Sequence, residues 1–168
     1  IDNHLEIFTT GALHLSHNLN RTIQKRGFNN PEQHTTFVRN QINSVIKSKS
    51  DILVLNGDLG DVDLLRMLIN SLNTCNCWLI EGNHDSKKDL LSLRNMDKVW
   101  RVEENICINW RDNLFHISHL PHLEFRGFYR NAYHPHAHTH GTLEPYLRAY
   151  DVGLDNNDML PISLDKVV

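Results

Sequence analysis

The sequence has few cysteines and no long apolar segment, and each shortage excludes a class of protein. Only three of its 168 residues are cysteine. Cys75 and Cys77 are too close together to suggest a disulfide framework, and Cys107 makes the number odd. A zinc knuckle is disfavoured because a second cysteine pair is missing. We therefore expect reduced, buried thiols and a cytoplasmic location.

No apolar run approaches the ~18 residues of a membrane span, and no signal-peptide pattern opens the sequence. The formal net charge of −3 provides no electrostatic attraction for duplex nucleic acid, although a local basic pocket is compatible with it. Hydrophobic residues make up 40% and charged residues 22%, as in a globular protein. We expect residues 1–168 to form a single domain with its own core.

Histidine, in contrast, is abundant, with 12 residues in all. His134, His136, His138 and His140 occupy alternate positions of one short stretch. In an extended segment alternate side chains share a face, so these imidazoles are predicted to line one side of a strand or strand-end loop. Neutral imidazole is the commonest metal ligand in proteins. The stretch predicts a metal site, and a merely solvated histidine tract is the alternative.

The first half of the chain alternates predicted strands (residues 5–10, 52–55 and 77–80) with predicted helices (residues 31–47, 61–72 and 87–94). Asn30 followed by Pro31 is a typical helix start. The second half is predicted to hold short antiparallel strands over residues 99–103, 106–110, 114–118, 148–152 and 162–167, with a hairpin turn at residues 111–113. Together these elements predict a layered α/β fold.

Candidate metal ligands follow several of these predicted strands. They are His14, Asp58, Asn83, His119, His138 and His140. In open α/β sheets ligands bind beyond the carboxyl ends of the strands, where such side chains would converge. Mixed oxygen and nitrogen ligands suit Mn²⁺, Fe²⁺ or Zn²⁺ and suit Ca²⁺ poorly. Their number exceeds one tetrahedral site and fits two ions ~3.5–4 Å apart, an arrangement used for displacement at phosphorus.

In this order the motifs resemble the calcineurin-like metallophosphoesterase superfamily, in particular its small phage and bacterial members. The matching segments are Leu13-His14, Gly57-Asp58, Gly82-Asn83-His84-Asp85, Ser118-His119-Leu120-Pro121, Ala137-His138-Thr139-His140-Gly141, Tyr150 to Asp155 and Pro161 to Asp165. The resemblance spans nearly the whole chain. It implies a layered α/β/β/α sandwich with mixed sheets.

The resemblance also implies roles for individual residues. His14 and His140 would hold one divalent ion, and Asn83, His119 and His138 a second, with Asp58 bridging them. The ions would be Mn, Fe, Zn or Ni, with Mn favoured. A metal-bridging hydroxide would attack phosphorus in line. His84, oriented by Asp85, would act as general acid or transition-state stabiliser.

Two positions depart from the family pattern. Ala137 replaces a glycine, which is tolerated if the backbone there is not left-handed. Ala12 stands where the family has a metal-binding aspartate, so the site loses one of its two ligating carboxylates. Ala12 is therefore either a substitution made to silence the enzyme or the natural residue of a weakened member, in which substrate phosphate supplies the missing oxygens.

We expect hydrolysis of a small phosphate ester, monoester or diester, such as a nucleotide or cyclic nucleotide. The alternatives are a nuclease or RNA-end-processing phosphatase, which the overall acidity disfavours, and a non-catalytic phospholigand-binding protein. Candidate substrate contacts are His17, Arg21, Arg126 and Arg130, since imidazole and guanidinium groups bind phosphate oxygens. A solvated or structural role is the alternative for each.

Overall fold

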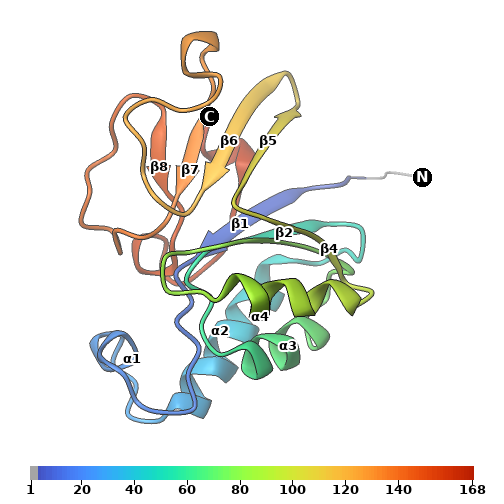
Figure 1. Cartoon of the computed structure of the whole chain (residues 1–168), viewed down its shortest axis with the longest axis vertical. Helices are drawn as coiled ribbons and strands as arrows, with labels where there is room; N and C mark the ends of the chain where they lie inside the picture. The colour runs from blue at the N-terminus through green and yellow to red at the C-terminus, as the bar shows by residue number, and fades with distance from the viewer. Residues whose placement is uncertain (1–3) are drawn as a thin grey trace.

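The computed structural model describes residues 4–168 and shows an α/β fold built on a five-stranded mixed sheet. Its strands are β1 (Ile7–Gly11), β2 (Ile52–Asn56), β3 (Asn76–Ile80), β4 (Val99–Glu103) and β9 (Ile162–Ser163), in the order β4-β3-β2-β1-β9 (Figure 1). Strands β1 to β4 run parallel, and β9 runs antiparallel to β1. All of β2 is buried, as its unbroken apolar sequence predicts for a central strand.

Four α-helices lie on one side of the sheet, below it in Figure 1. They are α1 (Arg21–Lys25), α2 (Pro31–Val45), α3 (Val62–Asn70) and α4 (Lys87–Ser92), and a 3-10 turn, Leu93–Asn95, follows α4. The predicted start of α2 is confirmed, because the Asn30 side chain accepts hydrogen bonds from the backbone N–H groups of Glu32 and Gln33. Asp61 caps α3 in the same way.

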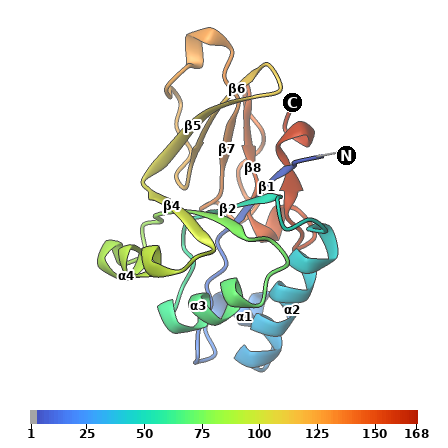
Figure 2. The ribbon, with the colours of Figure 1, turned by 90° about the vertical axis from the view of Figure 1, so that its right-hand side faces the viewer.

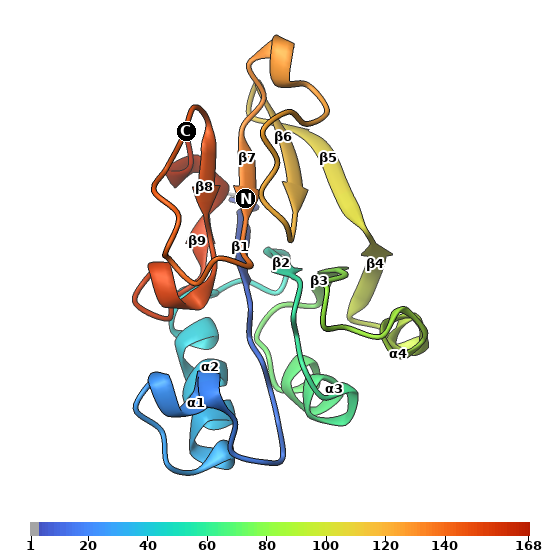
Figure 3. The same cartoon turned by 60° about the vertical axis from the view of Figure 1, so that its left-hand side comes forward.

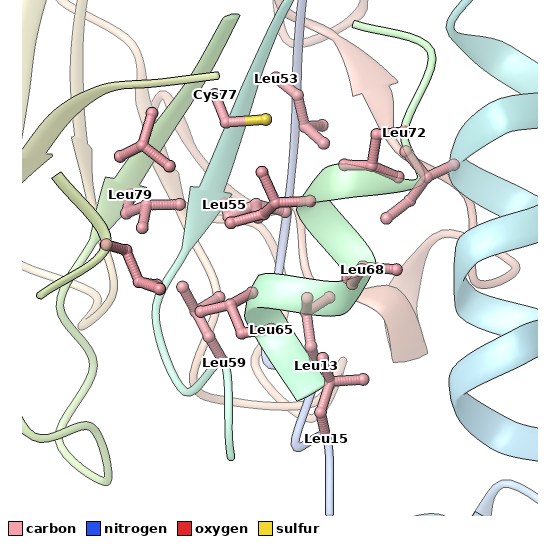
Figure 4. Close-up of a cluster of buried hydrophobic side chains, with 14 of the residues drawn as sticks. Leu13, Leu15, Leu53, Leu55, Leu59, Leu65, Leu68, Leu72, Cys77 and Leu79 are labelled. Carbon is pink, nitrogen blue, oxygen red and sulfur yellow. The ribbon is translucent and has the colours of Figure 1, made fainter. Parts of the chain in front are cut away.

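The main core fills the space between the sheet and the helices. Leu53 and Leu55 of β2 and Leu79 of β3 are buried in one cluster with Leu65 and Leu68 of α3 (Figure 4). Full burial of each such side chain contributes about 1.5–3 kcal/mol. This packing fixes where the carboxyl ends of the parallel strands lie.

A second β layer covers the other face of the sheet (Figure 2). It contains β5 (Asn105–Trp110), β6 (Asn113–Ser118), β7 (His134–His136) and β8 (Ala149–Asp151). The predicted β5–β6 hairpin is confirmed, and Arg111 and Asp112 both adopt the positive φ angles, 46° and 67°, that a tight hairpin turn needs. Phe115 and Ile117 of β6 pack in a second core cluster with Val54 of the sheet.

Some expectations about the second half of the chain are wrong. Its strands are not all antiparallel, because β4 pairs in parallel with β3 and β7 in parallel with β8. The predicted strand over residues 162–167 ends at Ser163, whose side chain caps a 3-10 turn, Leu164–Lys166. Every α-helix in the described part of the chain precedes β4 and lies on the helical side. Residues 4–168 therefore form three layers: helices, sheet and second β layer.

No helix within residues 4–168 combines the length and the apolar character that a membrane crossing requires.

Two histidines buried in the fold make acid sensitivity a testable property. Burial and the neighbouring Arg26 lower the pKa of His34 to about 4, and burial, opposed by a hydrogen bond with the His116 carbonyl, lowers the pKa of His134 to about 3. The unfolded chain binds a proton at each histidine below about pH 6.5, whereas the folded chain stays neutral until its lower pKa. The folded state therefore loses stability as the pH falls from about 6.5 towards 3 to 4.

We expect urea unfolding of the metal-free protein to show this loss, at about 2 kcal/mol per histidine by pH 5. The variant His34→Gln should have a shallower dependence of unfolding free energy on pH, by up to about 1.4 kcal/mol per pH unit between pH 6.5 and 4. His17→Gln is the control, because the His17 side chain is 61% exposed. An equal slope in the His34 variant and the parent would contradict the prediction.

Candidate metal centre

The six predicted metal ligands come from loops at the carboxyl ends of strands in both β layers. His14, Asp58 and Asn83 follow β1, β2 and β3, which run parallel. His119 directly follows β6, and the loop after β7 carries His138 and His140. Figure 3 shows β6 and β7 running down towards β1 and β2. The strand ends of the two layers therefore meet at one edge of the molecule.

One group of these side chains, which we name the second lobe, consists of Asp58, Asn83, His119 and His138. The Nε2 atom of His119 lies 3.1 Å from Asp58 Oδ2 and 3.1 Å from Asn83 Oδ1. Asp58, His119 and His138 each offer a ligand atom within 4.8 Å of the other two. An ionised carboxylate, an amide oxygen and two imidazoles thus converge on one point.

A second group, which we name the first lobe, consists of His14 and His140 with Asp58 shared. The Nε2 atoms of His14 and His140 are 3.2 Å apart, and their rings are stacked at 5.0 Å between centroids. His14 Nε2 also lies 3.8 Å from Asp58 Oδ2, the same oxygen that contacts His119. The structure therefore brings all six predicted ligands into one cluster, with Asp58 between the lobes.

The backbone of this cluster is unusual. Five positions have left-handed φ angles of 49° to 53°: Ala12, His14, Asp58, His138 and His140. Non-glycine residues rarely adopt this conformation, and strained backbone of this kind concentrates at functional sites. Four of the five are candidate ligands themselves, so the left-handed backbone coincides with the side chains that form the cluster.

These left-handed residues overturn one expectation about the histidine stretch. Its four imidazoles do not share one face, because only His134 and His136 lie on β7 and the next two histidines leave the extended conformation. His134 lies instead against Phe125, with 4.6 Å between ring centroids. Its Nδ1 donates to the His116 carbonyl, and its Nε2 accepts from the His122 backbone N–H. His136 is buried beside Tyr146.

Two glycines allow the loops to approach closely. A Cβ atom at Gly57 would lie 2.3 Å from the His119 ring, and one at Gly82 would lie 2.1 Å from the Asp58 backbone nitrogen. Gly57 also has a φ of 73°. Glycine before Asp58 and before Asn83 is therefore a packing requirement of the cluster.

Two of the imidazoles are oriented by acceptors outside the cluster. His119 Nδ1 contacts the backbone oxygen of Asn56 at 3.0 Å, and His140 Nδ1 contacts Asp155 Oδ2 at 2.6 Å. In each ring a hydrogen bond from Nδ1–H leaves Nε2 free to face the cluster, which is how metal-binding histidines are commonly held.

Asp155 is in turn held by Arg26. The Arg26 guanidinium, whose side chain is 3% exposed, donates to both Asp155 oxygens at 2.8 Å. It also donates to the backbone oxygens of Ala12 and Leu13. The sequence prediction missed Asn56, Arg26 and Asp155 as supports of the site. The available signal was weak: Asp155 ends a segment that resembles the metallophosphoesterase family, but its spacing alone indicates only a turn.

The electrostatics of the cluster favour the metal-binding forms of Asp58 and His14. Burial raises the pKa of Asp58, but hydrogen bonds from the His119 ring and the His84 backbone N–H outweigh it, and the pKa is about 2. Burial, with contributions from His140 and Arg26, lowers the pKa of His14 to about 4 although Asp58 opposes the change. At neutral pH Asp58 is therefore ionised and His14 is neutral.

The donor set fits a divalent cation. Burial lowers the pKa of His119, but Asp58 and the Asn56 carbonyl reverse this, and the pKa lies above the ordinary value. A proton on His119 Nε2 thus lies between two oxygens that attract positive charge, and a metal ion would satisfy the same oxygens. The Nδ1 atom of His138 is buried without a hydrogen-bond partner in the described part of the chain. Unpaired buried nitrogen of this kind needs a ligand or water.

The two predicted catalytic residues have different surroundings. The His84 ring is exposed beside the cluster, 6.1 Å from the His14 ring between centroids, and its backbone N–H donates to Asp58 Oδ1 at 2.9 Å. Asp85 does not orient His84 as expected. Its carboxylate accepts backbone N–H groups from Gly82, Leu59 and Gly60, at 2.8, 2.8 and 3.4 Å. Asp85 therefore ties the loop after β2 to the loop after β3.

We expect Asp85→Asn to lower the free energy of unfolding by about 1–3 kcal/mol, because an amide offers one acceptor oxygen where the carboxylate offers two. Since the loops carry Asp58 and Asn83, metal affinity should also fall by about 10–100-fold. Urea unfolding and Mn²⁺ titration measure the two effects. Asp89→Asn, on the exposed side of α4, is the matched control, and equal behaviour of the two variants would contradict the role of Asp85.

The predicted substrate contacts are only partly near the cluster. His17 follows His14 in the same loop, but its Nε2 atom lies 3.4 Å from Asp61 Oδ1 and its side chain is largely exposed. Arg21 is exposed on α1. Arg126 and Arg130 flank Gly127, which packs on Leu114 at the start of β6, whereas the cluster lies at the end of β6. The structure therefore places the loop of Arg126 and Arg130 by the start of β6, because the loop folds back along the strand.

A cleft opens beside the second lobe. Its volume is about 380 Å³, and its lining includes Asn83, His119, Glu81 and Glu104. A space of this size lies within the range of small-molecule sites.

Comparisons with known proteins indicate the fold of the chain and do not bear on its chemistry. No protein-family model and no curated protein matches the sequence. Among solved structures, the protein of unknown function AQ665 from Aquifex aeolicus is similar, with a TM-score of 0.73 and 18% sequence identity, over 98% of this chain and 100% of that chain. The chain is thus an α/β protein whose three-layer arrangement recurs in a distant protein.

Proposed function

We propose that this protein is a two-metal phosphoesterase of the calcineurin-like type, which hydrolyses a small phosphate ester. The observation that carries the proposal is the position of Asp58 Oδ2, 3.8 Å from His14 Nε2 and 3.1 Å from His119 Nε2. One carboxylate oxygen between two sets of imidazoles is the arrangement that a bridged pair of divalent ions needs. The helices, the sheet and the second β layer correspond to three of the four layers of the α/β/β/α sandwich that this family implies, and residues 4–168 have no α-helix on the far side of the second β layer.

In this proposal His14 and His140 hold one ion, Asn83, His119 and His138 hold the other, and Asp58 contributes to both. When bound, the ions supply a water of lowered pKa and positive charge for the phosphoryl oxygens. Mn²⁺ is the favoured ion, since the ligands mix oxygen and nitrogen. His84, exposed at the edge of the cluster, donates a proton to the leaving-group oxygen.

The cleft beside Asn83 and His119 supports a small substrate such as a nucleotide or cyclic nucleotide. The net charge of −3 disfavours RNA or DNA, whose binding needs a basic surface. A non-catalytic phospholigand-binding protein is the second candidate. It is favoured by one observation, the methyl group of Ala12 beside the first lobe.

A panel of phosphate esters tests the proposal. The Mn²⁺-loaded protein should hydrolyse at least one of p-nitrophenyl phosphate, bis(p-nitrophenyl) phosphate or a 2′,3′-cyclic nucleotide in preference to a single-stranded RNA oligomer. His84→Gln should lower kcat by about 10²–10⁴-fold while metal content is retained, because His84 contacts the cluster through its backbone rather than its ring. His4→Gln, at an exposed histidine before β1, should stay close to the parent. Turnover that survives both EDTA and His84→Gln would refute the proposal.

A further inference from the structure

We infer that the two lobes bind metal unequally: the second lobe holds a resident ion, and the first lobe takes its ion only together with a phosphate group. This inference rests on the proposed function and concerns the order in which the ions bind. It follows from the ligands and charges that surround each lobe.

The lobes differ in the number of protein ligands. The second lobe offers four, from Asp58, Asn83, His119 and His138. In the described part of the chain, its Asp58, His119 and His138 form the single group of three acidic, cysteine or histidine side chains whose ligand atoms all lie within 4.8 Å. The first lobe offers two imidazoles and a share of Asp58 Oδ2. That oxygen lies 3.1 Å from His119 Nε2 and 3.8 Å from His14 Nε2, so it is 0.7 Å closer to the second lobe.

The nearby carboxylate of Asp155 cannot fill the gap in the first lobe. Its Oδ2 atom accepts from His140 Nδ1 at 2.6 Å and from Arg26 Nη2 at 2.8 Å, and its Oδ1 atom accepts from Arg26 Nε at 2.8 Å. A carboxylate that moved into the lobe would give up these charge-assisted hydrogen bonds. Ala12, whose backbone oxygen Arg26 also contacts, offers only a methyl group.

Charge also separates the lobes. The buried Arg26 guanidinium lies under the first lobe and donates to the Ala12 and Leu13 carbonyls of the loop that carries His14. An ion already held in the second lobe repels a second cation, and Arg26 adds little net charge because Asp155 offsets it. Among the six candidate ligands, Asp58 is the one carboxylate available to balance two divalent ions.

A phosphate group supplies what the first lobe lacks. It carries negative charge and several oxygens, and Mn²⁺ accepts oxygen ligands readily. Bound beside His14 and His140, it would complete the coordination of the first-lobe ion and reduce the repulsion between the ions. Linkage requires the reverse as well: the first-lobe ion raises phosphate affinity by the same factor by which phosphate raises the affinity for that ion.

Mn²⁺ titration of the metal-free native chain tests this inference, with bound and exchange-coupled Mn²⁺ followed by electron paramagnetic resonance. We expect one ion per chain in chloride buffer, and a second, exchange-coupled ion when inorganic phosphate is added at constant ionic strength. Phosphate should raise the affinity for the second ion by about 5–150-fold, the usual range of such coupling. Isothermal titration with phosphate should give the same factor when the second ion is present.

Variants identify which lobe holds which ion. His140→Ala should keep the first ion and lose the phosphate-dependent one, whereas His138→Ala should weaken the resident ion. Ala12→Asp should bind two ions without phosphate. Two ions of equal affinity in chloride would overturn the inference while the proposed function survives, whereas one ion at saturating phosphate would overturn both. Failure to bind any Mn²⁺ would overturn both.

Discussion

Ala12→Asp is expected to raise the Mn²⁺-dependent turnover of a phosphodiester such as bis(p-nitrophenyl) phosphate by more than about 100-fold. Losing even an indirect support of a metal ligand typically costs about 10–100-fold in affinity or activity, and a missing ligand should cost more. Position 12 adjoins Asp58, because the Ala12 N–H donates to the Gly57 oxygen at 2.8 Å. Its φ of 53° is one that aspartate adopts more readily than alanine.

Two controls separate the carboxylate from the backbone. Ala12→Gly relieves the left-handed conformation and should stabilise the metal-free protein by about 1–2 kcal/mol without a gain in turnover. Ala12→Asn keeps the shape of aspartate but adds no charge. In Ala12→Asp the buried, unpaired carboxylate should lower the melting temperature without metal, and Mn²⁺ should restore it.

The outcome of Ala12→Asp also tests the explanation that Ala12 silences the enzyme. A large gain supports a silenced or weakened hydrolase whose remaining groups are intact. Unchanged turnover, with two ions bound, would contradict the silenced-enzyme explanation and favour the phospholigand-binding alternative.

Asp58→Asn is expected to have the opposite effect, because it removes the carboxylate shared by both lobes. Binding of both ions should weaken by more than about 100-fold, and any phosphoesterase activity should fall at least as far. Asparagine is nearly isosteric with aspartate and tolerates the φ of 50° at this position, so the fold should be retained. Circular dichroism checks the fold, and equilibrium dialysis with Mn²⁺ measures the loss of ions.

Asp61→Asn is the matched control for this variant. Asp61 follows Asp58 in the same loop and caps α3, and asparagine is an equally good cap. Metal binding and stability should therefore stay close to those of the parent. Tight Mn²⁺ binding by Asp58→Asn would show that the ions bind elsewhere in the molecule.

The elements of the first half were largely predictable, for local physical reasons. The run Ile52 to Leu55 has no polar residue, so its burial on both faces could be foreseen, and all of β2 is buried. Asn30 and Pro31 define the start of α2 through interactions within one helical turn. The β5–β6 hairpin likewise depends on a two-residue turn.

Elements whose direction depends on distant partners were not predictable in the same way. The parallel pairings of β4 with β3 and of β7 with β8 arise from how the two layers cover the core. The fold of the loop that takes Arg126 and Arg130 away from the cluster depends on packing of Gly127 against Leu114. Neither the strand pairings nor the packing of Gly127 is indicated by the sequence of the segment itself.

The sequence by itself determined which side chains can bind metal and that they follow strands, because ligand chemistry and strand patterns are local properties. The tertiary structure alone decided how they meet. His138 and His140 are left-handed and lie in different lobes. Asp85 accepts hydrogen bonds from the backbone of two loops, and Asp155, held by Arg26, contacts His140. These relations join residues up to 129 positions apart, so packing rather than any short stretch of sequence sets them.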